Sequence, residues 1–150
     1  MTTIAYDGRY IAIDSRVSCD GHIASNSIDK FYITDDWVLF WSGAIHQKDL
    51  YVDTFLAKGE FHDEPEVWLM GFKKSTKEVF SIYVKNKRFL TDKLEWKDGH
   101  GSGSCYAIGA MEFGASAVEA VKIAMGRDCA TGGKINCFDT HTGKFIKVKQ

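Results

Sequence analysis

The sequence predicts an α+β fold built on antiparallel sheets. Short apolar runs separated by polar turns dominate the chain, and helical periodicity is confined to two segments. Successive strands follow one another without a helix between them, whereas a doubly wound parallel sheet would need a helix after nearly every strand. The length of 150 residues is that of one domain, so we expect a single domain over residues 1–150.

The first 43 residues are predicted to form strands. Asp7-Gly8 is a strong turn signal between two apolar runs, which predicts a hairpin at the start of the chain. The run at 37–41 is continuously apolar and is typical of a buried strand. We expect strands in this part of the chain at 2–6, 10–13, 22–27, 31–34 and 37–41.

A first helix is predicted at 45–58. Tyr51, Val52, Phe55 and Leu56 fall on one face at helical spacing, and a glycine follows at position 59. An acidic linker at 60–66 carries the only proline of the chain.

The second half of the chain is predicted to return to strands before a second helix. Ser116 and Glu119 match a capping box that opens a helix at 117–125. We expect strands at 67–72, 79–84 and 87–90, a glycine-rich loop at 98–104, a buried strand at 105–108, and final strands at 134–138 and 145–148.

Composition and charge exclude several classes of protein. Hydrophobic residues make up 45% and charged residues 26%, which is ordinary for a globular chain and excludes wholesale disorder. The net charge of −1 gives no basic excess for nucleic acid or for a membrane surface. No apolar run reaches the roughly 18 residues of a membrane span, and no secretory signal opens the chain. We therefore expect a cytoplasmic protein.

The cysteines and histidines do not have metal-ligand spacing. No CxxC or HxxxH occurs among the four cysteines and five histidines, so we predict free thiols and neither a metal nor a cofactor.

The N-terminus carries the first candidate for chemistry. Cytosolic processing removes Met1 before a small residue such as Thr2, which would then carry a free α-amino group beside its hydroxyl. An α-amine has a pKa of about 7.7–8.0 and is partly neutral near pH 7. One residue would thereby supply both a nucleophile and its base.

Asp14 and Lys30 are candidates for tuning that hydroxyl. Asp14 ends the second predicted strand, beside the start of the first, and Lys30 follows Asp29. A lysine near the hydroxyl of Thr2 would stabilise its deprotonated form, and a carboxylate would keep the lysine charged and aimed.

These residues belong to a pattern that resembles the proteasome β-subunit family, including the bacterial proteasome-like peptidases. The pattern runs in order over about two-thirds of the chain, and such proteins are N-terminal nucleophile hydrolases. The motifs are Thr2-Thr3-Ile4-Ala5, Ala12-Ile13-Asp14-Ser15-Arg16-Val17-Ser18, Asp29-Lys30, Trp41-Ser42-Gly43, Tyr106-Ala107-Ile108-Gly109 and the segment from Arg127 to Gly133.

The resemblance implies roles for particular residues. Thr2 matches the nucleophile, Asp14 and Lys30 the pair that tunes it, and the Gly43 N–H the oxyanion donor. Two further matches, Asp128 and Thr131, support the threonine amine. The residues implied to line the substrate site are Arg16, Ser18 and Trp41.

Trp41 also carries a prediction about specificity. It stands where the family places the floor of the pocket for the residue before the cleaved bond, and an indole there leaves little room. We expect a shallow pocket that prefers small residues.

The resemblance also implies an αββα sandwich, the Ntn-hydrolase fold, here a single proteasome-like domain. Two features depart from the family. One predicted helix stands where relatives have two long ones, so the helical layer is reduced, a brevity that would suit a compact phage genome. Ala110 follows Gly109 where a serine is usual, so we expect a supporting hydroxyl to be missing.

The function implied is that of a threonine peptidase without metal or cofactor. It would cleave peptides or unfolded protein, assemble as a homo-oligomer and have an ATP-driven unfoldase as a candidate partner. Two alternatives stay open: a catalytically weak or inactive scaffold or regulatory binding protein of the same fold, and an amidase acting on a small molecule.

Overall fold

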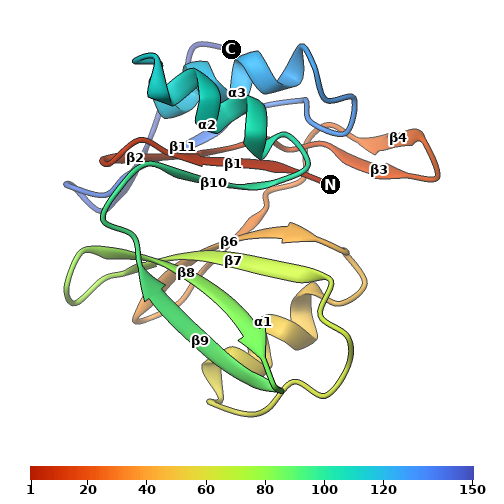
Figure 1. Cartoon of the computed structure of the whole chain (residues 1–150), viewed down its shortest axis with the longest axis vertical. Coiled ribbons are helices and arrows are strands. Elements are labelled where there is room, and N and C mark those ends of the chain that lie inside the picture. Colours follow the sequence, from red (N-terminus) through yellow and green to blue (C-terminus); the bar gives the residue numbers. More distant parts are fainter.

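Two antiparallel sheets face one another, and helices lie on their outer sides (Figure 1). The computed structural model describes all residues, Met1–Gln150. Helices α2 and α3 cover the first sheet, and α1 lies against the second. The predicted α+β class with antiparallel sheets is therefore confirmed, and the layers are those of a sandwich.

The first sheet has the strand order β10-β1-β2-β11-β12, and the second is a meander of β5-β6-β7-β8-β9. A separate two-stranded ribbon, β3-β4, extends from the first. The strands are β1 (Thr3–Tyr6), β2 (Tyr10–Ile13), β3 (Val17–Cys19), β4 (His22–Ser25), β5 (Phe31–Ile33), β6 (Trp37–Gly43), β7 (Val67–Lys73), β8 (Glu78–Lys85), β9 (Arg88–Lys93), β10 (Asp98–Gly101), β11 (Asn136–Asp139) and β12 (Lys144–Ile146), and the helices are α1 (Lys48–Leu56), α2 (Ser104–Glu112) and α3 (Ala117–Met125).

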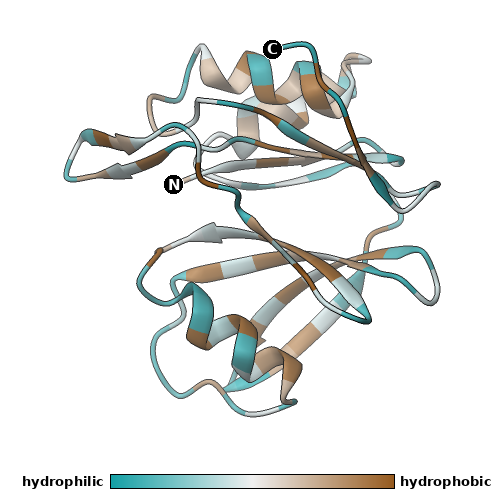
Figure 2. Cartoon of the chain, turned by 180° about the vertical axis from the view of Figure 1, so that it is seen from behind, coloured by the Kyte–Doolittle hydropathy of each residue, from teal (hydrophilic) through white to brown (hydrophobic).

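Three apolar clusters hold the layers together. The central one packs Ile4 and Phe138 of the first sheet against Phe40 and Met70 of the second. The other two fill the space between each sheet and its helices. Figure 2 shows hydrophobic bands along the strands of both sheets and largely hydrophilic loops at their ends. This packing fixes the strand ends against one another, and the candidate site lies at those ends.

The predicted capping box is confirmed at the start of α3. Ser116 accepts a hydrogen bond from the Glu119 N–H, and the Glu119 side chain accepts one from the Ser116 N–H. The buried face of α3 consists of small residues together with Val121. The helix at 117–125 therefore has the predicted bounds, whereas α1 is shorter at both ends than the predicted 45–58.

The predicted strand at 105–108 is wrong, because these residues lie in helix α2. Ala107 and Met111, four residues apart, face the first sheet, while Cys105 and Tyr106 are exposed. A four-residue apolar run has too little length to distinguish a strand from a turn of helix.

The predicted loop at 98–104 is also wrong in part, because β10 pairs with β1 along the sheet edge. Its glycines permit a close backbone approach. A Cβ at Gly101, where φ is +94°, would stand 1.9 Å from the carbonyl oxygen of Thr2. The ribbon strand β3 was not predicted.

Candidate active site

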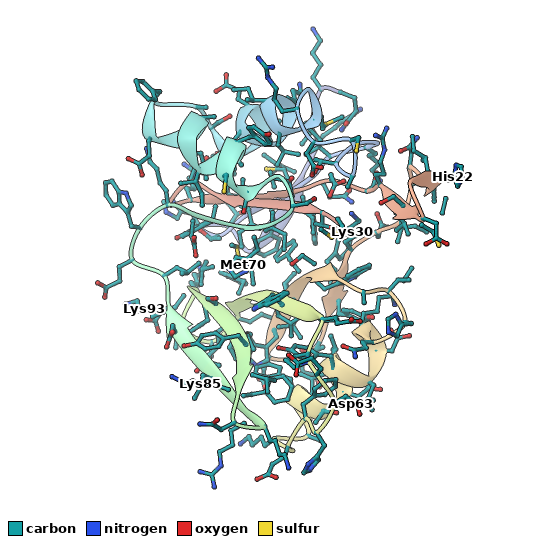
Figure 3. All side chains as sticks on the ribbon, turned by 45° about the vertical axis from the view of Figure 1, so that its right-hand side comes forward. His22, Lys30, Asp63, Met70, Lys85 and Lys93 are labelled. Carbon is teal, nitrogen blue, oxygen red and sulfur yellow. The ribbon has the colours of Figure 1, made fainter.

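Four strand ends meet around Thr2, between the two sheets. Thr2 precedes β1, Asp14 follows β2, Lys30 precedes β5 and Gly43 ends β6. Figure 3 shows Lys30 at the junction of the sheets. Residues far apart in the sequence are therefore brought together by strand pairing within each sheet and by the packing of one sheet on the other, rather than by local spacing.

Thr2, Lys30 and Asp14 form one buried hydrogen-bonded chain. The Lys30 Nζ donates to Thr2 Oγ1 at 2.6 Å and to Asp14 Oδ1 at 3.0 Å. None of the three residues has measurable solvent exposure. The ammonium also donates to the Met1 carbonyl oxygen at 3.1 Å, so its three hydrogens all have partners.

Backbone groups hold the Asp14 carboxylate in place. Its Oδ1 accepts from the Thr3 N–H at 3.1 Å, and its Oδ2 accepts from the Gly132 N–H at 2.9 Å. These fixed donors orient the carboxylate toward Lys30, and Asp14 in turn orients Lys30 toward the hydroxyl of Thr2.

Burial governs the protonation of Lys30. Desolvation lowers the pKa of the Lys30 ammonium below its usual value, and the charge of Asp14 opposes this shift without cancelling it. A lysine with a lowered pKa gives up its proton more readily and still favours negative charge on a neighbouring oxygen. This is the behaviour required of a group that activates a hydroxyl.

Asp128 and Thr131 form a second cluster beside the first. Asp128 Oδ2 accepts from Thr131 Oγ1 at 2.6 Å, and Thr131 Oγ1 lies 2.7 Å from Thr3 Oγ1. Burial works to raise the pKa of Asp128, but hydrogen bonds from Ser102 and Thr131 outweigh it and hold the pKa below its usual value. Both predicted residues therefore lie near the chain start: Thr131 contacts Thr3 directly, and Asp128 is linked to Thr3 through Thr131.

Position 110 carries no hydroxyl, and a different residue, Ser102, donates to Asp128. Ser102 Oγ donates to Asp128 Oδ2 at 2.5 Å, whereas Ala110 packs in the cluster between α2 and the first sheet. The signal in the sequence that could have identified Ser102 is its position between Gly101 and Gly103. Both glycines approach the start of the chain closely. A Cβ at Gly103 would stand 2.0 Å from Thr3 Oγ1.

Gly43 ends β6 in a conformation that a side chain would not tolerate. Its φ is +111°, and a Cβ would stand 1.9 Å from the Glu66 carbonyl oxygen. Gly43 borders the same two cavities as Thr2.

Two cavities border Thr2. The Trp41 cavity, of about 860 Å³, is lined by Trp41, Ser18 and Lys30 among others. The His100 cavity, of about 480 Å³, is lined by His100, Ser102, Ser81 and Tyr83 among others. The residues that border both are Met1, Thr2, Gly43 and Trp68.

Arg16 does not line either cavity. Its guanidinium donates to Asn26 Oδ1 at 2.8 Å and to the Cys129 carbonyl oxygen at 2.9 Å. It packs on Gly132, where a Cβ would stand 2.4 Å from Arg16 Cζ. These contacts brace the loop that carries Asp128 and Thr131, while the predicted lining positions Ser18 and Trp41 face the cavity.

No group of three or more histidine, cysteine, aspartate or glutamate side chains gathers closely enough to hold a metal ion. The four cysteines are free thiols. None of the helices combines the length and apolarity needed to cross a membrane.

Two solved structures share the overall fold of this chain. Thiobacillus denitrificans BPH has a TM-score of 0.67 and 17% identity over 99% of this chain and 98% of its own. The same protein in complex with epoxomicin has a TM-score of 0.68 and 17% identity over 99% of both chains. At this identity the likeness concerns the fold. No family model and no curated protein matches the chain.

Proposed function

We propose that this chain is a proteasome-like threonine peptidase of the Ntn-hydrolase fold, with Thr2 as its nucleophile once Met1 is removed. The carrying observation is the 2.6 Å contact between Thr2 Oγ1 and a fully buried lysine that is itself paired with Asp14. A lysine enclosed in this way has no surface role, and its environment suits activation of a hydroxyl.

Removal of Met1 would convert the buried arrangement into an open site. Met1 borders both cavities, so its loss joins them over Thr2. The Met1 carbonyl that now accepts from Lys30 would leave with it, which frees one ammonium hydrogen. The new α-amine of Thr2 would lie on the same residue as the attacking oxygen and would take its proton.

The reaction then follows from these positions. Thr2 Oγ1 attacks the peptide carbonyl carbon while the α-amine accepts the hydroxyl proton. The oxyanion is stabilised by the Gly43 N–H, as such donors do in acyl transfer. The amine passes the proton to the leaving nitrogen as the C–N bond breaks and an ester forms on Thr2. Water, deprotonated by the same amine, hydrolyses this ester and restores the site.

The comparisons agree with this proposal at the level of fold. BPH, of similar fold, forms a complex with the proteasome inhibitor epoxomicin, so this compound is a suitable probe here. We further propose a homo-oligomer located in the cytoplasm, acting on peptides or unfolded protein, with an ATP-driven unfoldase as its partner.

The alternative is a binding or scaffold protein of the same fold. With Met1 in place, Thr2 has no free amine, is fully buried and shares Lys30 with the Met1 carbonyl. A chain that retained Met1 would remain in this closed state and would have no base for catalysis.

Peptide hydrolysis by matched variants tests the proposal. Protein lacking Met1 should cleave a set of fluorogenic peptides, Thr2→Ser should retain activity, and Thr2→Ala should have none. Epoxomicin should add its mass to the N-terminal fragment of the wild type and not to that of Thr2→Ala. Equal hydrolysis by wild type and Thr2→Ala would contradict the assignment of the nucleophile.

A further inference from the structure

The His100 cavity lies beside Thr2 on the side that Lys30 does not border. The resemblance places Trp41 at the floor of the pocket for the residue before the cleaved bond, so the Trp41 cavity is taken as the site for that residue. A peptide bound across Thr2 and Gly43 would then place the following residue in the His100 cavity. The chemistry of this lining decides which side chain that residue carries.

Two of the hydroxyls that line the cavity, those of Tyr83 and Ser102, donate their hydrogens to carboxylates. Tyr83 donates to Asp92 Oδ2 at 2.6 Å, and Ser102 donates to Asp128 Oδ2 at 2.5 Å. Each hydroxyl has one hydrogen, so what remains for a ligand is its oxygen lone pairs. These positions therefore present hydrogen-bond acceptors to the cavity.

His100 also lies close to a carboxylate. Its Nε2 lies 3.7 Å from Asp98 Oδ2 and 3.3 Å from Ser81 Oγ, and its side chain is 14% exposed. The hydrogen bond from His100 lowers the pKa of Asp98, so this carboxylate is negative at neutral pH. Asp98 is thus the third carboxylate, after Asp92 and Asp128, that lies next to a residue of the lining.

The fixed charges around the cavity are mostly negative. No lysine or arginine is among the lining residues, while Asp92, Asp98 and Asp128 each contact one of them. Besides His100, positive charge comes from the amino group of the chain start, since Met1 and Thr2 line the cavity, and from the amino end of α2, equivalent to about half a charge. Asp128 accepts from Ser102 next to that end and offsets it.

We propose that the His100 cavity is a subsite for a lysine or arginine side chain on the residue that follows the cleaved bond. Such a side chain brings several N–H donors and a positive charge, which match a lining of acceptors backed by carboxylates. This inference rests on the proposed function and adds the leaving-side specificity of the same site.

Peptides that differ only at the residue after the cleaved bond test the subsite. Lys and Arg peptides should have the highest kcat/KM, Gln and Leu lower values, and Glu the lowest. Each partly exposed carboxylate is expected to contribute about a twofold to fivefold preference for Lys over Gln. The preference should shrink as salt is raised, because salt screens exposed charges.

Isosteric variants separate this subsite from a general charge effect. Asp98→Asn and Asp92→Asn should each reduce the Lys-to-Gln ratio of kcat/KM. Asp53→Asn on α1 removes the same charge far from the cavity and should leave the ratio unchanged. Asp53 is exposed and has no side-chain partner, so it is a suitable control.

The two proposals fail in different ways. Cleavage of the Gln peptide without a preference for Lys or Arg would overturn the subsite and leave the peptidase intact. If no peptide is cleaved, the peptidase proposal fails, and fluorescence anisotropy of the same labelled peptides decides the subsite. Tighter binding of Lys than Gln peptide, lost in Asp98→Asn, would support it, whereas equal binding would overturn it.

Discussion

Replacing Lys30 by methionine should cost about 3 kcal/mol of unfolding free energy. The change leaves Asp14 buried without its ion-pair partner, and breaking a buried pair in this way costs about 3–5 kcal/mol. The lower end applies because backbone N–H groups of Thr3 and Gly132 still bind the carboxylate. For a chain of this size, that corresponds to a fall of about 6–12 °C in Tm.

Denaturant unfolding of matched variants measures this cost. Lys147→Met removes the same charge from an exposed position and should stay within about 0.5 kcal/mol of wild type. The double variant Lys30→Met with Asp14→Asn should regain much of the lost stability, because no buried charge is then unpaired. Peptidase activity should be absent from both Lys30 variants. A Lys30→Met protein as stable as Lys147→Met would refute the account of a dry, buried ion pair.

The Lys30→Met variant also tests how the free energy of unfolding depends on pH. Burial lowers the pKa of Lys30 in the folded state, so between the folded and unfolded pKa values the unfolded chain binds more protons. The contribution of Lys30 therefore raises stability as pH increases through that window. Lys30→Met should lack this alkaline increment relative to Lys147→Met, and identical pH profiles of the two variants would contradict the lowered pKa.

Three further changes test other parts of the site. Gly43→Ala should cost at least about 1–3 kcal/mol and abolish activity, since its Cβ would meet the Glu66 carbonyl at 1.9 Å; thermal melts and peptide assays measure both. Ser102→Ala should cost about 1 kcal/mol near pH 7 by removing a donor to Asp128. Because hydrogen bonds lower the pKa of Asp128, that cost should shrink as pH falls through its folded pKa; a loss independent of pH would contradict this role. The wild-type protein should prefer small residues before the cleaved bond. In a peptide panel, Trp41→Ala should shift this preference toward Leu and Phe. Highest turnover of the wild type after Phe or Leu would contradict the shallow pocket.

Patterns of neighbouring residues predicted those parts of the fold that depend on local interactions alone. The capping box of Ser116 and Glu119 has the predicted geometry, because both hydrogen bonds form within one helical turn. The hairpin at Asp7-Gly8 and the buried strand around Phe40 also follow from local pattern. Helix α2 did not, because its buried positions, Ala107 and Met111, are too few to establish a helical period.

The site required information that spacing alone does not carry. Thr2 and Lys30 are 28 positions apart and lie next to strands of different sheets, so they meet through the packing of the two sheets, which local spacing does not predict. Ser102 was missed because a glycine-rich segment reads as a flexible loop. In the structure those glycines lie in β10 and at the start of α2, where the backbone packs closely against the first residues of the chain. Glycine is required there by packing and not by a local turn.

The intact mass of the protein purified from its native cells tests the central claim most directly. The account predicts a mass lower by one methionine residue and an N-terminal sequence that begins at Thr2, so that the α-amine is free to act as base. A mass that includes Met1 would leave Thr2 without that amine and would contradict the peptidase mechanism.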